Sequence, residues 1–376
     1  MVRPQLSLIL ATAGFLLTPL ATAADSLTAD ERFTLTAVSE EELENPWGLA
    51  FLPDGRMLVT ERPGRLRIVA TDGTLSEPLA NVPEVYDRGQ GGLLDVTLDP
   101  DFASNNTIYI SYSEPGDDGA GTAVARARLS DAGLADLSVI FRQQPKAGTS
   151  RHFGSRIVVA RDGTLFVTLG DRGLGEPAQD LQSHIGKIIR INRDGSVPSD
   201  NPFVGRDDAR PEIWSYGHRN VQGAALDPAT GQLWTVEHGA QGGDEINHPE
   251  AGKNYGWPVI TYGVDYSGEP IGEGTAKPGM EQPVHYWDPS IAPSGMTFYT
   301  GDAFPDWRGD IFVGSLKFAY LARLDIENGK VVREQKLLDD LGQRVRTVRQ
   351  GPDGNLYLLT DEDESAVLKL APASKS

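Results

Sequence analysis

Short apolar runs separated by turn residues recur along this chain, and no long segment has the periodicity of a helix. Each repeat consists of an apolar strand, a turn built on Asp-Gly or Asp-Pro, and a second apolar strand, a pattern typical of a β-hairpin. Six copies occupy residues 47–61, 93–114, 155–171, 222–239, 294–315 and 345–362. The turn opens on Asp54, Asp99, Asp162, Asp227 and Asp353 in five of them, whereas the turn of the 294–315 copy is less regular.

The six hairpins, together with further strands between them, predict an all-β, six-bladed β-propeller with four-stranded antiparallel blades. The further strands are expected at residues 65–70, 123–129, 187–192, 320–326 and 366–371. Residues 33–38 (FTLTAV) are predicted to pair with the last blade, which would close the ring and leave no free sheet edge. A β-sandwich or a β-helix is the alternative for so strand-rich a chain.

The first 23 residues have the features of a secretory signal peptide. Arg3 supplies a positive charge, residues 6–17 are apolar, and Ala21-Thr22-Ala23 provides small residues for cleavage. We therefore expect a signal peptide at 1–23, a single propeller domain at 24–376 and a periplasmic location, with an N-terminal membrane anchor as the alternative. No later segment approaches the roughly 18 continuous apolar residues of a membrane span, so membrane insertion of the mature chain is not expected.

The composition of the chain excludes several kinds of functional site. The chain has 376 residues, a net charge of −19 and no cysteine. The absence of cysteine excludes disulfides, thiolate nucleophiles and iron–sulfur clusters, and the negative charge argues against nucleic acid as a partner. The sequence also lacks dinucleotide-binding, P-loop, zinc-protease and EF-hand motifs. The glycine- and proline-rich stretch 262–283 is predicted to be a long loop that acts as a lid or as the rim of a site.

Basic side chains are scarce, with 34 Lys and Arg against 53 Asp and Glu, so their clustering is informative. Arg344 and Arg346 flank Val345, and on a strand they project from the same face. Lys317 directly follows another predicted strand, and Arg219 follows a turn. If inner strands line a central channel, these four cations can converge on one anion; taken singly, each can equally be an ordinary surface charge.

A histidine and a carboxylate flank the third hairpin. His152 lies just before its first strand, and Asp171 ends the second. Such a carboxylate can orient the imidazole of a catalytic base and stabilise its charged form; a structural histidine that caps a strand is the alternative. Gln90 has the same relative position in the preceding blade, among glycines that allow close approach of the backbone.

The segment 217–257 combines polar side chains and glycines more densely than any other part of the chain. It begins with Gly217-His218-Arg219-Asn220 and includes an acidic, glycine-rich turn, EHGAQGGDEIN. The turn offers backbone carbonyls and carboxylates, the mixed oxygen ligands that Ca²⁺ prefers; a solvated hairpin turn is the alternative. The segment predicts one wall of a site for an anionic cofactor bridged by a hard cation.

These motifs make the sequence resemble a known family. GHRN-x-QG, GGDEIN and NYGWP, together with NPWGLAFLPDG, GQGGLLDV, HFGSRIVVA and RVRTVRQGPDG, are similar to the soluble pyrroloquinoline quinone (PQQ)-dependent sugar dehydrogenases of the glucose/sorbosone dehydrogenase family. The resemblance runs from Asn45 to about Asp361 and is greatest to the periplasmic aldose sugar dehydrogenases. It implies a six-bladed propeller that oxidises aldoses at C1 to lactones by hydride transfer to PQQ, with Ca²⁺ as a second cofactor.

The resemblance also implies a role for individual residues. His152 would be the general base and Asp171 would orient it, while Gln90 and Arg219 would lie beside the reactive quinone and the sugar. The remaining implied contacts are Asn220, Lys317, Arg344 and Arg346 with PQQ, the carbonyls of Gly239 and Ala240 with the bridging Ca²⁺, and Glu245 and the carbonyl of Tyr255 with a second, structural Ca²⁺.

Two positions depart from the glucose-oxidising branch of the family. Arg151 precedes the proposed base where that branch has a carboxylate, and His238 replaces a glutamine. The preferred sugar is therefore open, as is the electron acceptor, for which a quinone or a cytochrome is possible. Two other functions remain as alternatives: a Ca²⁺-dependent lactone hydrolase on the same architecture, which would not need the Lys317, Arg344 and Arg346 cluster, and a non-catalytic binding propeller.

Overall fold

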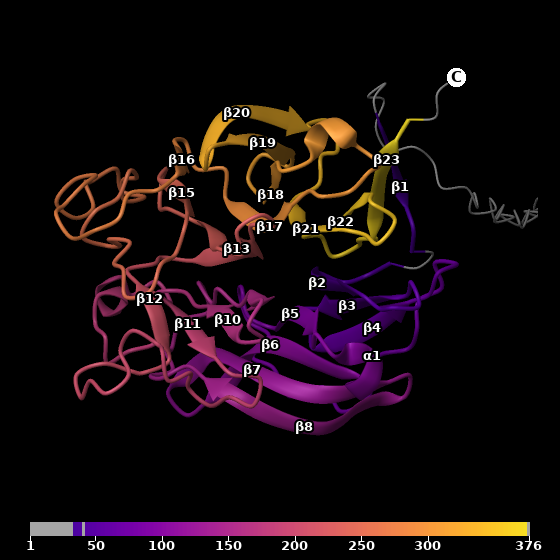
Figure 1. Ribbon diagram of the computed structural model, residues 1–376, viewed down its shortest axis with the longest axis horizontal. Coiled ribbons are helices and arrows are strands. Elements are labelled where there is room, and N and C mark those ends of the chain that lie inside the picture. The colour runs from indigo at the N-terminus through magenta and orange to yellow at the C-terminus, as the bar shows by residue number, and fades with distance from the viewer. Residues whose placement is uncertain (1–32, 40–41, 374–376) are drawn as a thin grey trace, which may run out of the picture.

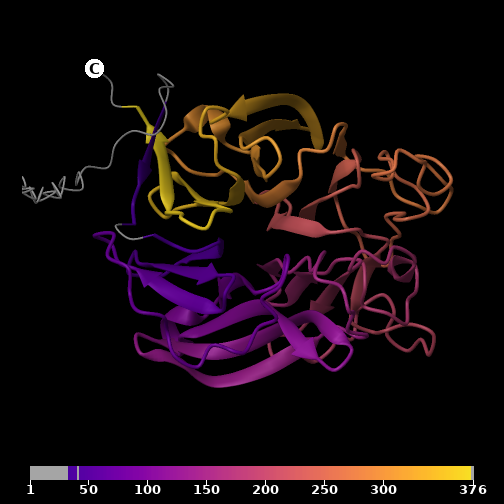
Figure 2. The same ribbon diagram turned by 180° about the vertical axis from the view of Figure 1, so that it is seen from behind.

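The computed structural model describes residues 33–39 and 42–373, which form six antiparallel sheets arranged around a central axis (Figure 1). The expected signal peptide at 1–23 lies outside the described residues. Among the described helices, none is long and apolar enough to cross a membrane. The view from behind shows the same closed ring of blades, with the first strand beside the last one (Figure 2).

The strands follow the chain blade by blade. The first three blades contain β2 (Pro46–Phe51), β3 (Met57–Glu61) and β4 (Arg65–Val69); β5 (Leu93–Leu98), β6 (Thr107–Gly116), β7 (Gly119–Ser130) and β8 (Gly133–Arg142); and β9 (Ile157–Val159), β10 (Leu165–Thr168), β11 (Lys187–Ile191) and β12 (Ile213–Tyr216). The last three contain β13 (Val221–Leu226), β14 (Leu233–Glu237), β15 (Asp244–Asn247) and β16 (His285–Trp287); β17 (Pro293–Phe298), β18 (Ile311–Ser315), β19 (Leu321–Glu327) and β20 (Lys330–Leu337); and β21 (Val345–Gln350), β22 (Leu356–Thr360), β23 (Leu368–Pro372) and β1 (Phe33–Ala37). The helices are short: α1 (Phe102–Asn105), η1 (Glu176–Ala178) and η2 (Pro305–Trp307).

The hairpin turns form for the reason that the repeats suggest. In the five regular copies, a side-chain oxygen of the opening aspartate accepts a hydrogen bond from the backbone N–H two residues later, at 2.8–3.1 Å. This local bond stabilises the turn between the two strands. In the Asp-Gly turns the glycine has a positive φ, for example 84° at Gly163, which only a residue without a Cβ adopts freely.

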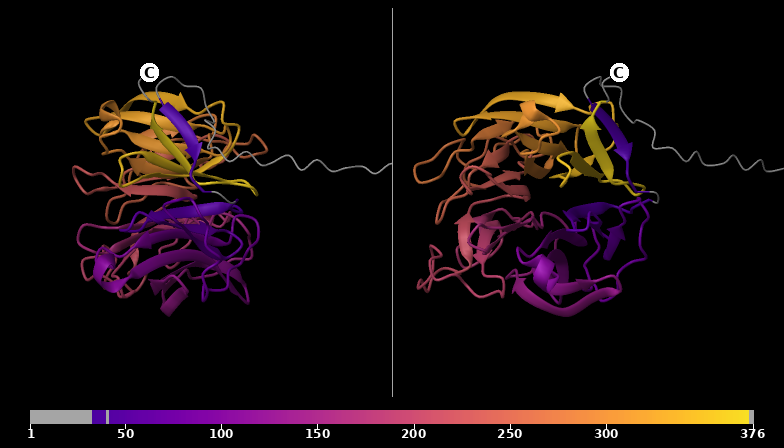
Figure 3. Two further views of the ribbon diagram at one scale, coloured as in Figure 1. Left: turned by 90° about the vertical axis from the view of Figure 1, so that its right-hand side faces the viewer. Right: turned by 45° about the vertical axis from the view of Figure 1, so that its right-hand side comes forward.

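The ring closes as expected. The innermost strands β2, β5, β9, β13, β17 and β21 each contact the innermost strand of the next blade, and β21 returns to β2. Strand β1 pairs with β23 from Phe33↔Pro372 to Ala37↔Leu368, so the two ends of the described chain complete one blade (Figure 3). An apolar cluster fills the space between each pair of neighbouring blades, which ties the blades together.

One blade differs from the four-strand expectation in detail. The β2–β4 sheet has three regular strands, and residues 75–80 take the fourth position through isolated bonds. Ser76 N–H donates to the Ile68 carbonyl at 2.8 Å, and Leu79 N–H donates to that of Leu66 at 2.9 Å. Pro78 lies between them and has no N–H to donate, which prevents a regular ladder.

Candidate functional site

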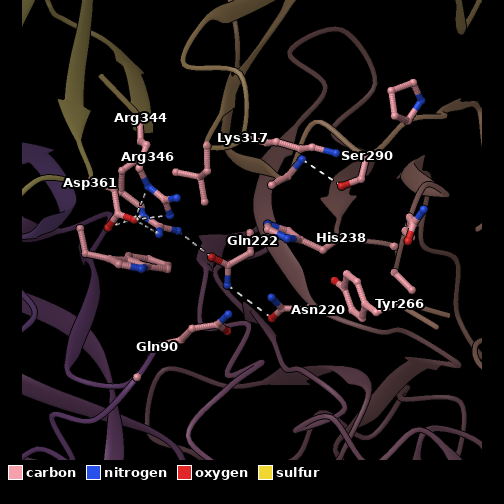
Figure 4. A pocket seen from close by; sticks show the side chains of 18 of the residues that line it. Gln90, Asn220, Gln222, His238, Tyr266, Ser290, Lys317, Arg344, Arg346 and Asp361 are labelled. Atoms are coloured by element: carbon pink, nitrogen blue, oxygen red, sulfur yellow. Dashed lines mark hydrogen bonds and ion pairs between the residues drawn. The ribbon is translucent and has the colours of Figure 1, made fainter. Parts of the chain in front are cut away.

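A cavity of about 860 Å³ opens at one end of the central channel (Figure 4). It is lined by segments that lead into or out of the inner strands of several blades. The lining residues are Trp47, Arg62, Gly89, Gln90, Asn220, Gln222, His238, Gly239, Ala240, Gln241, Tyr266, Pro289, Ser290, Ala292, Leu316, Lys317, Arg344, Arg346 and Asp361. Tyr266 belongs to the predicted 262–283 loop, which therefore forms part of the rim.

Three of the four predicted cations line this cavity, whereas Arg219 lines the smaller hollow described below. Lys317, Arg344 and Arg346 line the cavity, and Arg62, which the sequence reasoning missed, joins them. Both Arg344 and Arg346 contact Oδ2 of Asp361, at 2.8 and 2.9 Å. Although burial opposes the shift, the charge of Arg346 lowers the pKa of the Asp361 carboxyl well below its usual range. Four cations face one carboxylate, so the lining has a formal excess of three positive charges.

Polar side chains connect the arginines to the 217–257 wall. Nη1 of Arg346 donates to Oε1 of Gln222 at 2.8 Å. Nε2 of Gln222 donates to the carbonyl of Gly154 at 3.1 Å, and the N–H of Gly154 donates to Oδ1 of Asn220 at 3.2 Å. Gln222 was not assigned a role from the sequence, although it lies in the GHRN-x-QG motif.

The structure also brings His152 and Asp171 together. Nδ1 of His152 lies 2.6 Å from Oδ1 of Asp171. Asp171 accepts further hydrogen bonds from Trp257 Nε1 at 2.8 Å and from Gly173 N–H at 2.7 Å. The pair is positioned from the other side by Gln90, whose Oε1 accepts the backbone N–H of His152 at 2.7 Å. A carboxylate at Nδ1 fixes the tautomer that leaves Nε2 free to act as a base.

Burial and nearby positive charge keep this histidine neutral. Burial, and then the charge of Arg219, lowers the pKa of His152 below its ordinary value, against the opposing effect of Asp171. Burial also favours a raised pKa for Asp171, but the hydrogen bond with His152 lowers it overall. A neutral imidazole beside an ionised carboxylate is the form that accepts a proton.

The His152–Asp171 pair lies at the margin of the cavity. Gln90, which contacts His152, is a lining residue, whereas His152 and Asp171 themselves are not. Its geometry depends on a close backbone contact: a Cβ on Gly170 would lie 2.0 Å from the carbonyl oxygen of His152. The N–H of Asp171 donates to the carbonyl of Arg219 at 2.6 Å, which joins the pair to the 217–257 wall. Trp257, another residue without an assigned role, holds Asp171 and lies 5.2 Å from the guanidinium of Arg219.

The glycine-rich turn is packed tightly around Gly239. A Cβ at this position would lie 2.2 Å from the carbonyl oxygen of Gly242, so only glycine fits. The carbonyl of Gly239 accepts a hydrogen bond from Nη1 of Arg219. The carboxylate of Asp244 is used inside the turn, where it accepts bonds from Gly239 N–H at 2.8 Å and from the N–H groups of Ile291 and Ala292 at 2.7 and 3.0 Å. Asp244 therefore shapes the turn and has no oxygen left for the cavity.

Glu245 and Tyr255 lie with Glu237 and Arg219 around a smaller hollow, which shares His238 and Gly239 with the cavity. Burial and the negative charge of Glu237 raise the pKa of Glu245. Glu237 is held by His218 Nδ1 at 2.8 Å and by Arg219 N–H at 2.7 Å, whereas Glu245 accepts a hydrogen bond from Asn247 Nδ2 at 3.0 Å. A cation would relieve the repulsion between the two carboxylates. Within residues 33–39 and 42–373 no group of three or more His, Cys, Asp or Glu side chains is placed to hold a metal, so an ion here would also need carbonyl oxygens such as that of Tyr255.

Residues 43–369 match the family model described as glucose / sorbosone dehydrogenase. The chain belongs to this family. It is 49% identical over 365 residues to the aldose sugar dehydrogenase YliI of Escherichia coli, with 96% of this chain and 98% of that protein covered.

Two solved structures of relatives have the same fold. The apo-form of the soluble aldose sugar dehydrogenase from Escherichia coli superposes with a TM-score of 0.88 at 48% identity, over 90% of this chain and 99% of the other. The PQQ-bound form of the aldose sugar dehydrogenase from Streptomyces coelicolor superposes with a TM-score of 0.74 at 28% identity, over 91% of this chain and all of the other.

Proposed function

We propose that this protein is a PQQ-dependent aldose sugar dehydrogenase that oxidises sugars at C1 to lactones. The observation that carries the proposal is the coexistence of a cation-lined cavity with a neutral, carboxylate-bound histidine at its margin. The first suits a polyanionic cofactor and the second suits a proton acceptor. The family membership and the PQQ-bound relative support the same cofactor and substrate class.

The cavity fits PQQ on charge. PQQ is a tricarboxylate, and the lining has a formal excess of three positive charges. Lys317, Arg344 and Arg346 would hold the carboxylates, with Asn220 beside them. Buried nitrogens on Arg62 and His238 have no hydrogen-bond partner among the described residues, as expected where a ligand completes the site.

The residues around the cavity perform the remaining steps. Nε2 of His152 takes the proton of the C1 hydroxyl, and Asp171 holds the imidazole and stabilises the charge that it acquires. Gln90 keeps the backbone of His152 in place. Arg219 supplies positive charge where negative charge develops. PQQ, when bound, supplies the acceptor for the hydride that leaves C1.

The fit of the bridging Ca²⁺ is incomplete in this arrangement. Its expected ligands are the carbonyls of Gly239 and Ala240, and the first of these accepts a hydrogen bond from Arg219. A cation and this guanidinium would repel each other at the same oxygen, so Ca²⁺ binding favours an arrangement in which Arg219 turns away. The guanidinium is not fully held, because its buried Nε has no partner among the described residues. For the second Ca²⁺, the repelling pair of Glu237 and Glu245 provides the driving force.

The alternatives fit the cavity less well. A lactone hydrolase with Ca²⁺ in the channel would place that cation against Arg62, Lys317, Arg344 and Arg346, which repel it. A non-catalytic binding propeller would have no need of the His152–Asp171 pair.

A periplasmic location follows from the signal peptide expected at 1–23, and cell fractionation with precursor cleavage tests it. A quinone and a cytochrome are both candidates for the electron acceptor.

Reconstitution tests the proposal. Apo-protein is mixed with PQQ and Ca²⁺, and dye reduction is measured with a panel of aldoses. We expect sugar-dependent dye reduction and PQQ absorbance that stays with the protein through gel filtration. A protein that neither retains PQQ nor reduces the dye is not a PQQ-dependent dehydrogenase. Retention of PQQ without turnover would point to a binding propeller, and lactone hydrolysis with Ca²⁺ alone would favour the hydrolase.

A further inference from the structure

The indole of Trp257 binds the carboxylate of Asp171 from outside the cavity. Trp257 is not one of the cavity-lining residues, and it lies instead around the smaller hollow, together with Arg219 and Tyr255. Its Nε1–H donates to Oδ2 of Asp171 at 2.8 Å. An indole nitrogen is a donor only, so the direction of this hydrogen bond does not depend on any protonation state.

The two oxygens of Asp171 are bound by different partners. Oδ1 lies 2.6 Å from Nδ1 of His152 and accepts the N–H of Gly173 at 2.7 Å, whereas Oδ2 accepts the indole N–H. The torsion that turns an aspartate carboxylate is soft. Partners on Oδ1 alone therefore leave the carboxylate free to turn, and a donor on Oδ2 fixes its plane relative to the imidazole.

The backbone of Trp257 is itself held on both sides. Its N–H donates to the carbonyl of Gly217 at 2.9 Å, and its carbonyl accepts from Nε2 of Gln179 at 2.7 Å. Gln179 is fixed in turn by Asn254, whose Nδ2 donates to Oε1 of Gln179 at 2.8 Å. The indole is therefore carried by an anchored segment, as a donor that must hold another side chain in one orientation requires.

A second donor near Asp171 has a positive charge. Arg219 is close enough to act electrostatically on Asp171, but its Nη1 donates to the carbonyl of Gly239. A guanidinium on Oδ2 would neutralise the carboxylate and weaken its stabilisation of a protonated His152. The indole is uncharged, so it orients the same carboxylate without neutralising it.

We propose that Trp257 is a positioning residue for the base: its uncharged N–H holds Oδ2 of Asp171, so that Oδ1 stays directed at Nδ1 of His152. The carboxylate then keeps the negative charge that stabilises the imidazole once it has taken a proton. The inference rests on the proposed function, in which His152 takes the proton of the C1 hydroxyl. Trp257 acts through Asp171, from outside the set of cavity-lining residues.

A double-mutant cycle on protein reconstituted with PQQ and Ca²⁺ tests this. Trp257→Phe keeps a flat ring but removes the N–H. We expect kcat for aldose oxidation to fall by about 5- to 30-fold, because a hydrogen bond to a charged group is lost, while KM for the sugar changes by less than about twofold. In the His152→Ala background the same change should lower kcat by less than about a further twofold, because Asp171 then has no base to direct.

Two other variants complete the experiment. Trp257→His places a ring N–H at the equivalent position of a five-membered ring, and should recover most of the lost kcat at about pH 8, where an imidazole is neutral. Trp287→Phe is the matched control. It also removes an indole N–H that donates to a carboxylate, that of Glu334 at 3.0 Å, and it should leave kcat unchanged.

The outcomes separate the two proposals. An unchanged kcat in Trp257→Phe, equal losses in both backgrounds, loss of bound PQQ or no recovery in Trp257→His would overturn the inference and leave the proposed function intact. A wild-type protein without sugar-dependent turnover would overturn the proposed function, and the inference with it. Thermal melting checks folding. If the phenylalanine variant does not fold, Trp257→Met takes its place in the cycle and must show the same dependence on His152.

Discussion

Arg156 and the cavity arginines Arg344 and Arg346 lie near one another at the centre of the ring, and their surroundings differ sharply. Arg156 is almost fully buried and every part of it is occupied: it donates to Asp95 at 3.1 Å, to Thr347 at 2.8 Å and to the carbonyl of Gln222 at 2.7 Å, and its guanidinium lies 4.0 Å from the Trp47 ring. In the cavity, by contrast, Arg344 and Arg346 share one carboxylate, and the side chain of Arg344 is 49% exposed.

The comparison separates structural cations from ligand-binding ones. Arg156 belongs to a closed network that joins several blades, and its charge is balanced by a buried carboxylate. Burial lowers its pKa to about 9, so it stays charged at neutral pH. The cavity cations exceed their carboxylate partners, so their charge is available to a ligand. Residue type alone does not distinguish the two groups, but the excess of four cations over one carboxylate in the cavity lining does.

The largest expected effect is the loss of stability when Arg156 is removed from its buried hydrogen-bond network. Arg156→Leu leaves Asp95 buried with a weaker partner, Arg349 at 3.4 Å, and we expect a loss of about 3–5 kcal/mol in the free energy of unfolding, measured by urea denaturation. Arg344→Leu, the matched change in the cavity, should cost less than about 1 kcal/mol. Adding Asp95→Asn to Arg156→Leu should recover part of the loss. Similar costs for the two single variants would remove the distinction between the groups.

The next effect concerns turnover. In His152→Ala the base is gone, and kcat should fall by at least about 100-fold, the usual scale for loss of a general base. PQQ binding should persist, because the cations that hold the charge are untouched. Dye-reduction kinetics and retained PQQ absorbance give the two readouts. Unchanged turnover would reject His152 as the base. Loss of turnover together with loss of PQQ binding would mean that His152 contributes to cofactor binding.

A smaller difference should appear between the paired arginines. Arg346 is buried and is fixed by both Asp361 and Gln222, whereas Arg344 is half exposed. A charged hydrogen bond from a buried, preorganised donor is worth about 1.5–3 kcal/mol, so Arg346→Met should weaken PQQ binding by about 10- to 100-fold. Arg344→Met should weaken it by less than about fivefold because solvent screens the exposed charge. Titration of both apo-variants with PQQ tests this difference. Equal losses of PQQ affinity would mean that solvent exposure does not determine how much each arginine contributes to binding.

The same contrast explains which features the sequence could predict. The propeller followed from six copies of one hairpin, because each turn aspartate acts locally on the N–H two residues away. The convergence of Lys317, Arg344 and Arg346 followed from the alternation of the two arginines around Val345 and from the place of Lys317 just after a strand. The partners Asp361, Gln222 and Trp257 were not assigned, since their contacts span 15 to 124 residues of chain and no local pattern records them. The hydrogen bond from Arg219 to the Gly239 carbonyl likewise depends on packing in three dimensions.

The smallest effect should come from a cation that contacts neither network. Arg151 is exposed, and its positive charge contributes to the lowered pKa of His152 after burial and Arg219. The neutral imidazole is the competent base, so the lowered pKa keeps kcat/KM constant through neutral pH and shifts its decline to more acidic solution. Arg151→Glu reverses the charge and should raise the pKa of His152, which moves that decline toward neutral pH, and 1 M salt should shrink the displacement because it screens exposed charges. Arg344→Glu, a similar reversal at a side chain that is not among the groups acting on His152, is the control and should leave the position of the decline unchanged. A decline that stays in place in Arg151→Glu would show that burial and Arg219 alone set the protonation of the base.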